Sequence, residues 1–540
     1  MVPSAFVMLE AIPLTPNGKV DRRALSEFSV KSLKLSTDTF VAPRTPEEKL
    51  LANIWASVLG IEQVSIHDSF FELGGHSLLA TQLMLRICET FLVDIPLHHL
   101  FQSPTVAGIA KIIDTSRQAK IVDTKTIIDL NAEAVLDITI QPPKISVDVF
   151  AKPSSIFLTG ATGFLGTYLL YDLLMQTRAN IYCLIRSSSV AEGKQRLEST
   201  LESYSLWNET FHSRIIPIIG DLSEPLLGIP EPQFRHLANQ IEIIYHNGAW
   251  VNHIYPYSVL KAANVLGTQE VLRLASQIKP KPVHFISTTG VLFSSANVDT
   301  DTQIKIVRES DFLDASQVIE SGYVQSKWVA ENLVREAGLR GLPVCIYRPT
   351  RIGGDSQTGI SNPNDFLNLA IKGYIQLGKV PILDDKKENI IPVDYASRAI
   401  IHISQQTDLL GKTFHLVNPR PILLSDLVNW IRSLGYSLEE TAYEQWRTEL
   451  NHHQENVLYP FLSLFPQDKS SDKKLPRTKV PQFDSQNTLE GLSTDIVCPV
   501  VDTELFGIYF SYFWSSGFLA RPSGQKTSIQ PDLINGVKEI

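Results

Sequence analysis

With 540 residues the chain is longer than one hydrophobic core usually serves, so two or three folded units are expected. Its hydrophobic content of 44% and charged content of 19% are those of an ordinary soluble globular protein, and a net charge of -9 without a Lys/Arg cluster argues against nucleic-acid binding. Four widely spaced cysteines and the lack of a long apolar run predict no metal site, no membrane span and a reducing, cytoplasmic setting.

The first part of the chain divides by composition. Residues 1–30 end in the turn-rich stretch LTPNGKVDRRAL. Within about 38–116, apolar residues recur at helical spacing, as Leu50, Ile54 and Val58 do. The chain then becomes polar and rich in proline, which predicts an interdomain linker over about 117–153.

Beyond residue 154, short β-branched runs alternate with longer amphipathic segments. The runs that read as buried strands are SIFLTG, NIYCLIR, RIIPIIGD, IEIIYHNGA, PVHFISTTG and LPVCIYRPT. This alternation predicts an α/β fold, a doubly wound parallel sheet of Rossmann type over about 154–415. The order becomes irregular after about residue 355, which predicts a smaller C-terminal substrate-binding subdomain from about 355–385 and 416–530.

Ser77 follows two glycines in DSFFELGGHSLLATQL and precedes an apolar helical run. A serine there can simply cap the helix. The surrounding residues, however, resemble the phosphopantetheine attachment site of nonribosomal peptide carrier domains, and FQSPTVAGIAKII is similar to that family's final helix. The resemblance implies a small four-helix carrier domain over 38–116. It also implies a 4'-phosphopantetheine arm on Ser77, added by a phosphopantetheinyl transferase, and a helix N-terminus suits its phosphodiester.

The opening stretch IPLTPNGKVDRRAL resembles the last motif of an adenylation domain, and Lys19 matches the lysine that contacts the acyl-adenylate there. The rest of such a domain is absent from the sequence. We therefore expect residues 1–30 to be an adenylation-domain remnant. The chain is then either a fragment of a larger synthetase or the partner of a separate adenylation enzyme.

A glycine-rich loop follows the first predicted strand and opens a helix. Such a loop lets backbone N–H groups approach a pyrophosphate at the helix N-terminus. The next strand ends in Arg186 and no acidic residue, which favours NADPH over NADH because a guanidinium matches a 2'-phosphate. Arg196 is a second candidate, although an arginine exposed to solvent on a helix fits nearly as well. The cofactor-binding residues predicted besides these two arginines are Gly160, Thr162, Gly163, Phe164, Leu165, Gly166, Asp221, Leu222, Asn247, Ala249, Tyr323, Lys327 and Pro349.

Tyr323 and Lys327 lie four residues apart in GYVQSK and so share one face of a predicted helix. A chain with 16 tyrosines would show about one such pair by chance. This pair lies between the ISTTG and VCIYRPT strands, where a dinucleotide-binding sheet presents side chains to nicotinamide. Thr288, at the end of the preceding strand, supplies a third catalytic candidate.

In their order, GATGFLG, YHNGA, Thr288, YVQSK and YRPTRIGG resemble an extended short-chain dehydrogenase/reductase, specifically the terminal thioester reductase domain of nonribosomal peptide synthetases. The resemblance implies that NADPH reduces a carrier-bound acyl or peptidyl thioester, supplied by upstream synthetase modules, to an aldehyde or a primary alcohol. Tyr323 and Thr288 would donate hydrogen bonds to the oxyanion, while Lys327 would lower the tyrosine pKa and bind the ribose. The family usually has glycine at the position of Thr350.

Three alternatives remain beside this function. A sugar-nucleotide epimerase or dehydratase shares the fold and the Tyr/Lys pair, but a covalent carrier argues against a freely diffusing substrate. A carboxylic acid or aminoadipate reductase uses the same tail, and only upstream sequence would distinguish it. A redox-silent condensing cyclase or docking module is the third, and the retained Thr288, Tyr323 and Lys327 argue against it.

Overall fold

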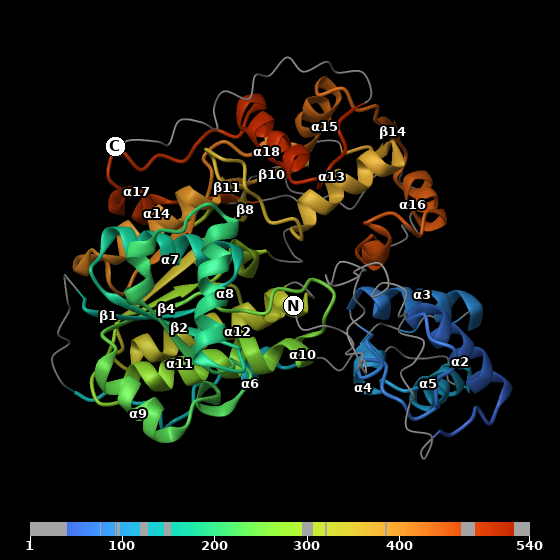
Figure 1. The fold of residues 1–540 in the computed structure, drawn as a ribbon, viewed down its shortest axis with the longest axis horizontal. Coiled ribbons are helices and arrows are strands. Elements are labelled where there is room, and N and C mark those ends of the chain that lie inside the picture. The colour runs from blue at the N-terminus through green and yellow to red at the C-terminus, as the bar shows by residue number, and fades with distance from the viewer. Residues whose placement is uncertain are drawn as a thin grey trace, which may run out of the picture. The chain divides into compact units, whose positions relative to one another are not determined.

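The structure is a computed structural model that divides the chain into two compact units (Figure 1). The first comprises Met1–Ile127 with Tyr459–Pro466, and the second comprises Ile128–Leu458 with Gln467–Ile540. The residues that the structure describes are 40–75, 77–91, 93, 95, 98–118, 128–144, 153–293, 306–318, 321–383, 386–465 and 481–522. The predicted adenylation remnant at 1–30, with Lys19, lies outside them.

The predicted carrier segment folds as a helical bundle. Its helices are α2 (Pro46–Leu59), α3 (Ser77–Phe91), α4 (His98–Gln102) and α5 (Val106–Gln118). Helix α2 begins after Thr45, whose hydroxyl accepts from the Glu48 N–H, and ends at Gly60 in the left-handed conformation. The ring of Phe70 meets Trp55 edge-on in the bundle core, with centroids 5.7 Å apart. The four-helix prediction is confirmed.

The second unit is built on a seven-stranded sheet in the order β12-β7-β5-β4-β1-β2-β3, and all its neighbouring strands are parallel. Its strands are β1 (Ser155–Thr159), β2 (Asn180–Ile185), β3 (Ile215–Ile219), β4 (Ile243–His246), β5 (Val283–Ile286), β7 (Val344–Pro349) and β12 (Thr413–Leu416). The six predicted strands are all present, and β12 is a seventh that the pattern did not predict. Strand order reverses at the β1–β4 pair, the switch point at which such sheets bind ligands.

Helices cover both faces of this sheet (Figure 1). Side chains alternate along each strand, so Phe157 of β1 packs into one core cluster while Ile156 and Leu158 pack into the other. The helices on the Phe157 face are α9 (Glu231–Gln240), α10 (Tyr257–Lys261), α11 (Gly267–Ser276) and α12 (Gly322–Leu339). Those on the opposite face are α7 (Phe164–Gln176), α8 (Val190–Ser203) and α14 (Val393–Ser404). The doubly wound prediction is confirmed.

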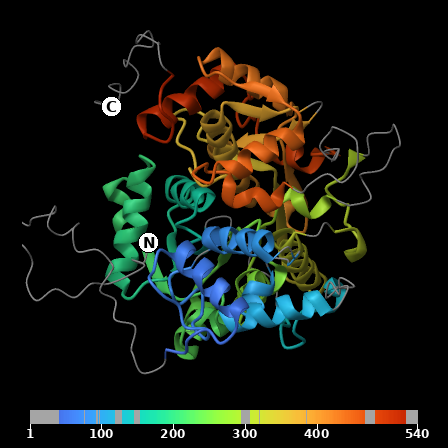
Figure 2. The same ribbon diagram turned by 90° about the vertical axis from the view of Figure 1, so that its right-hand side faces the viewer.

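A smaller subdomain stands at one side of the sheet, drawn in orange and red in Figure 2. Its own core contains Ile371, Ile431, Phe506 and Phe510. The elements that contribute to it are α13 (Phe366–Leu377), α15 (Leu424–Ser433) and α18 (Thr503–Ser515), flanked by α16 (Tyr443–His452) and the short strands β8 (Arg351–Gly353), β9 (Lys379–Pro381), β10 (Lys387–Glu388), β11 (Ile390–Pro392), β13 (Ile422–Leu423) and β14 (Glu439–Thr441). Among the described helices, none combines the length and the apolar character needed to cross a bilayer.

Composition predicted a linker over 117–153, but residues 128–144 of that range pack on the second unit. Leu130, Leu136 and Ile140 are buried in the same core cluster as α9, α11 and α12. A short helix, α6 (Leu130–Glu133), begins this segment. The difference arises because three widely spaced apolar residues give no periodic signal, although each finds a site on the folded surface.

Candidate active site

A cavity of about 1040 Å³ opens at the carboxyl ends of the central strands, around the switch point. This volume reaches the upper end of the range typical of ligand pockets. The predicted site residues in its walls are Gly160, Thr162, Gly163, Phe164, Leu165, Arg186, Arg196, Asp221, Leu222, Asn247, Ala249, Thr288, Tyr323, Lys327 and Pro349. Gly166 lies beneath the loop and is not part of the lining. The fold therefore brings residues from six different strand ends to one place.

The glycine loop between β1 and α7 is packed too tightly for side chains. A β-carbon at Gly160, whose φ is 72°, would lie 2.7 Å from the α-carbon of Gly248. A β-carbon at Gly166 would lie 1.9 Å from the carbonyl oxygen of Gly160. Gly163 precedes α7 and offers no side-chain cap, so the first N–H groups of this helix have no side-chain acceptor at Gly163. Such an N-terminus is suited to a pyrophosphate.

A buried hydrogen-bond chain fixes the two strands of the switch point. The Thr159 hydroxyl accepts from the Gly248 N–H at 2.9 Å and bonds to Nδ1 of His246 at 2.8 Å. Nε2 of His246 bonds to the Thr268 hydroxyl at 2.9 Å. Burial lowers the pKa of His246 to about 3, so its ring is neutral. Sequence reasoning did not single out His246 or Thr268, because a buried His in a strand is usually a core residue.

Two arginines stand beside the second strand. Arg186 follows β2, is exposed and lines the cavity. Arg196, on α8, donates from its guanidinium to the Arg186 carbonyl at 3.1 Å. Within the part of the chain that is described, the guanidinium of Arg186 itself has no hydrogen-bond or ion-pair partner. Arg196 thus holds the main chain of Arg186, whose own charge faces the cavity unpaired.

The three catalytic candidates meet on the opposite wall. Thr288 caps a 3₁₀ turn (Thr289–Leu292), its hydroxyl oxygen accepting from the Gly290 N–H at 3.1 Å, which leaves the hydroxyl hydrogen available. Tyr323 and Lys327 lie in the first two turns of α12 and both line the cavity. Nζ of Lys327 donates to the Ile286 carbonyl at 2.8 Å, two residues before Thr288.

Burial sets the protonation of this group. It raises the pKa of Tyr323 to about 12, so the phenol carries its proton at neutral pH. It lowers the pKa of Lys327 to about 7, against the opposing effect of Glu331 one helical turn further on. Glu331 is itself buried, pairs with Arg348 at 2.6 Å and accepts from the Ser287 hydroxyl at 2.6 Å. This network anchors α12 to the strand end that carries Thr288.

Asn264 is a further site residue that the sequence did not reveal. It lies in a π-helical turn (Ala262–Leu266) between α10 and α11 and is buried. Its amide oxygen accepts from the Trp250 N–H at 2.6 Å, and its amide nitrogen donates to the Trp250 carbonyl at 3.1 Å and to the Ser326 hydroxyl at 2.9 Å. It therefore ties the loop after β4 to α12 between Tyr323 and Lys327.

The remaining wall carries polar residues that the sequence also missed. The His253 ring meets Tyr323 edge-on with centroids 5.8 Å apart. Arg351 pairs with Glu388 at 3.0 Å and with Asp365 at 3.4 Å. They come from loops and from the subdomain, where no periodic pattern marks them. No group of three or more His, Cys, Asp or Glu side chains among the described residues is placed to hold a metal ion.

Thr350, which stands where the resembled family usually has glycine, is also in the cavity wall. Its hydroxyl donates to the Asn389 carbonyl at 2.9 Å, and its N–H donates to the Leu416 carbonyl at 3.0 Å. The larger side chain is thus accommodated by a hydrogen bond to the residue that precedes strand β11.

The predicted attachment serine lies in the first unit. Ser77 is the first residue of α3. In the turn before it, Gly74 has a φ of 95°, and a β-carbon at Gly75 would lie 2.4 Å from the Phe70 ring. Both glycines are therefore required by the turn, which delivers Ser77 to a helix N-terminus.

Comparison with known proteins identifies relatives for both units. A family profile described as "Male sterility protein" matches residues 158–400, and "Phosphopantetheine attachment site" matches residues 49–113. The terminal R domain from the myxalamid PKS-NRPS biosynthetic pathway is 42% identical with a TM-score of 0.68, covering 73% of this chain and 99% of that structure.

Two curated proteins match nearly the whole chain. A linear gramicidin synthase component of Brevibacillus parabrevis is 41% identical over 528 residues, which are 96% of this chain and 10% of that protein. L-2-aminoadipate reductase of Saccharomyces cerevisiae is 33% identical over 569 residues, 97% of this chain and 40% of that protein. The chain thus spans a tenth of one relative and two fifths of the other.

Proposed function

The chain belongs to the family of terminal reductase domains of nonribosomal peptide assembly lines, preceded by a phosphopantetheine carrier, and we propose that it uses NADPH to release an acyl or peptidyl thioester carried on Ser77. The product is an aldehyde or a primary alcohol. The observation that carries this proposal is the cavity in which the glycine loop and Arg186 lie opposite Thr288, Tyr323 and Lys327.

The residues present fit a dinucleotide. The uncapped start of α7 and the crowded glycines Gly160 and Gly166 form a cradle for a pyrophosphate. The unpaired guanidinium of Arg186 favours the 2'-phosphate of NADPH. Asp221 and Leu222 would lie against the adenine, and Lys327 against the nicotinamide ribose. The bound cofactor would supply a hydride to the thioester carbonyl carbon.

Side chains of the protein would then stabilise the negative charge on the substrate oxygen and supply its proton. Tyr323 holds a proton on its phenol oxygen and gives it to the oxyanion that develops on the substrate. The Thr288 hydroxyl donates a second hydrogen bond, since its oxygen already accepts from Gly290. A positive charge on Lys327 stabilises the phenolate that Tyr323 leaves behind. Collapse of the tetrahedral adduct frees the carrier thiol and an aldehyde, and a second reduction gives the alcohol.

The proposed partners follow from the carrier. A phosphopantetheinyl transferase would modify Ser77, and upstream modules or a separate adenylation enzyme would load the arm. The match of Lys19 to an adenylation motif supports residues 1–30 as the last part of such a domain. An aminoadipate or other carboxylic acid reductase remains the second candidate, favoured by the 33% identity over the same span. Sequence upstream of the carrier would distinguish the two.

Reduction of a carrier-bound thioester tests the proposal directly. The full chain would be loaded with an acyl-pantetheine on Ser77 and NADPH consumption followed by absorbance, with products identified by mass spectrometry. Tyr323→Phe should lower turnover by about 10²–10³, the usual effect of removing a donor to an oxyanion. Tyr171→Phe, which removes a hydroxyl from α7 outside the cavity, is the matched control. Unchanged turnover in Tyr323→Phe, or a cyclised product without NADPH consumption, would contradict the proposal.

A further inference from the structure

Residues 128–144, which we call the strap, connect the carrier to the reductase and lie on the reductase surface. Three of their apolar side chains, Leu130, Leu136 and Ile140, are 4%, 2% and 1% exposed. They join the core cluster that contains α11 and α12. None of the strap residues lines the cavity. The strap is therefore packed into the core of the reductase but takes no part in forming the cavity.

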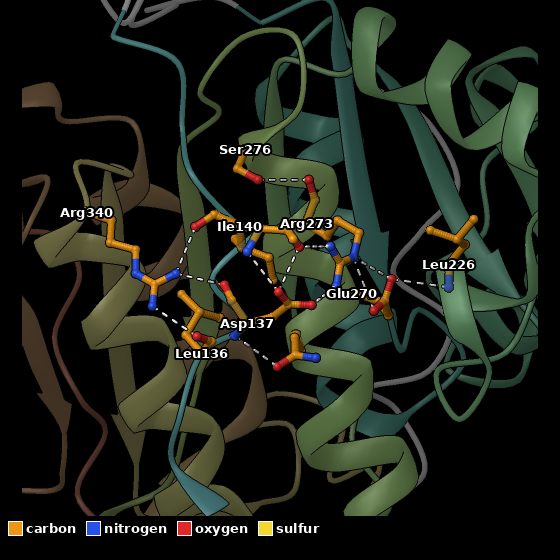
Figure 3. A network of polar contacts seen from close by, with 10 residues as sticks. Leu136, Asp137, Ile140, Leu226, Glu270, Arg273, Ser276 and Arg340 are labelled. Carbon is orange, nitrogen blue, oxygen red and sulfur yellow. Dashed lines mark hydrogen bonds and ion pairs between the residues drawn. The ribbon is translucent and has the colours of Figure 1, made fainter.

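Arg340 binds the strap backbone from the end of α12. Its guanidinium donates to the carbonyls of Leu136 at 2.9 Å, Asp137 at 2.8 Å and Ile140 at 3.0 Å (Figure 3). A guanidinium has five N–H donors in a fixed fork, so one side chain can satisfy three carbonyls and a carboxylate together. The side chain is 17% exposed and is also paired with Glu336 at 3.0 Å. Arg340 thus holds a turn of the strap against the helix that carries Tyr323.

Asp137 makes the second attachment, to α11. Its carboxylate pairs with Arg273 at 2.7 Å (Figure 3). The Arg273 guanidinium also donates to the Thr139 hydroxyl. Arg273 and the Thr139 donors hold the pKa of Asp137 well below its usual range. Arg273 is oriented in turn by Glu270 at 3.1 Å. The pair is partly sheltered, with side-chain exposures of 20% and 32%.

A third attachment lies at the start of the strap. Glu133 pairs with Lys261 at 2.6 Å and accepts from the Tyr257 hydroxyl at 2.8 Å. Both partners belong to α10. The strap is accordingly fixed at three places along its length, on three successive helices of the reductase.

We propose that the strap anchors the carrier's tether, so that the covalent tether between the carrier and the start of the reductase is limited to residues 119–127. This rests on the proposed function, because the tethered group is the acyl chain on Ser77. Nine residues lie between Gln118 and Ile128, whereas 34 would lie between Gln118 and Pro153 if the strap were released. The effective concentration of a tethered group falls with about the −3/2 power of tether length, so release would lower it roughly sevenfold.

The test compares a tethered with an untethered substrate. In the full chain, a strap variant that removes every attachment, Glu133→Gln, Asp137→Asn and Arg340→Met combined with Leu130→Ser, Leu136→Ser and Ile140→Ser, should slow single-turnover reduction of the Ser77-bound thioester roughly sevenfold. Reduction of a soluble acyl-pantetheine should be unchanged, because the cavity is not altered. Arg235→Met, which removes a surface arginine paired with Glu231 on α9, is the control and should leave both rates unchanged.

An insertion distinguishes the effect of a longer tether from damage to the fold. Adding about 25 Gly/Ser residues after Gln118, with the strap intact, should reproduce the same loss for the tethered substrate alone. Equal or faster tethered reduction in the strap variant, or a loss that the insertion does not reproduce, would overturn the proposal. A slower soluble reaction in the strap variant would show instead that the strap supports the active site, and would also overturn it.

Deuterium exchange reports on anchoring without any activity. Backbone amides of 128–144 should exchange slowly in the unaltered chain and rapidly in the strap variant, while β1 stays protected in both. Fast exchange of these amides in the unaltered chain would contradict the proposal that the strap is held on the reductase. Failure of the unaltered chain to reduce the soluble thioester would count against the proposed function instead, and the exchange result would still decide whether the strap is an anchor.

Discussion

Replacing Gly166 with alanine should disable the cofactor cradle although the residue does not line the cavity. The added β-carbon would lie 1.9 Å from the carbonyl oxygen of Gly160 and 2.8 Å from its carbonyl carbon. Ordinary contact begins near 3.4 Å, so the loop has to move by about 1.5 Å. The same carbonyl accepts from the Gly163 N–H at 3.0 Å and from the Asn247 amide at 3.3 Å, so the displacement spreads through the loop.

The helix itself would not oppose the change, since Gly166 is the third residue of α7 and alanine is a better helix former than glycine. Any loss of NADPH affinity in this variant therefore reports the displacement of the glycine loop. A displaced loop weakens its charge-assisted hydrogen bonds to the pyrophosphate, worth about 1.5–3 kcal/mol, so we expect the Kd for NADPH to rise about 10²-fold, or about 2.8 kcal/mol. Overpacking should lower the free energy of unfolding by about 1–3 kcal/mol.

Gly507→Ala is the matched control, because it makes the same change in helix α18, at a residue that does not line the cavity and where the β-carbon would have no neighbouring heavy atom within 4 Å. Its Kd for NADPH should change by less than about threefold, which is under 0.7 kcal/mol. Both constants can be measured by NADPH fluorescence titration, with circular dichroism to verify that each variant is folded. Equal NADPH binding by a folded Gly166→Ala protein and by Gly507→Ala would contradict the role of the glycine loop in cofactor binding.

Ser77→Ala should fail to gain the phosphopantetheine mass from coenzyme A and a transferase, as read by peptide mass spectrometry, yet should still reduce a soluble thioester. Arg186→Ala should weaken NADPH by about 1.5–3 kcal/mol and NADH hardly at all, and equal weakening in titrations would contradict the 2'-phosphate role. Burial lowers the pKa of both His246 and His284 to about 3, so the unfolded chain binds more protons between that value and about 6.5. The stability that these neutral rings contribute is complete above about pH 6.5 and is lost as the pH falls towards 3. The urea midpoint of unfolding should therefore be lower at pH 5 than at pH 7, and a higher midpoint at pH 5 would contradict this prediction.

Much of the candidate site could be predicted from local sequence. Six strands were recognisable from the sequence. Both faces of a parallel sheet are buried, so its strands consist of continuous apolar runs. Parallel strands present their carboxyl ends at one edge, so motifs at those ends, such as the glycine loop, Arg186 and Thr288, had to converge. The spacing of Tyr323 and Lys327 similarly placed both on one helix face.

Tertiary structure decided what depends on contacts between distant segments. The strap could not be predicted, because its polar composition matches a linker and its partners Arg273 and Arg340 lie more than 130 residues away. The contact of Arg196 with the Arg186 carbonyl also appears only in the fold, and because Arg196 lines the cavity its role as a second phosphate ligand stays a prediction. The lowered pKa of Lys327 likewise follows from burial between strand and helix. Sequence thus specified which chemical groups are present, while packing determined their partners and protonation, because desolvation and ion pairing exist only once the chain has folded.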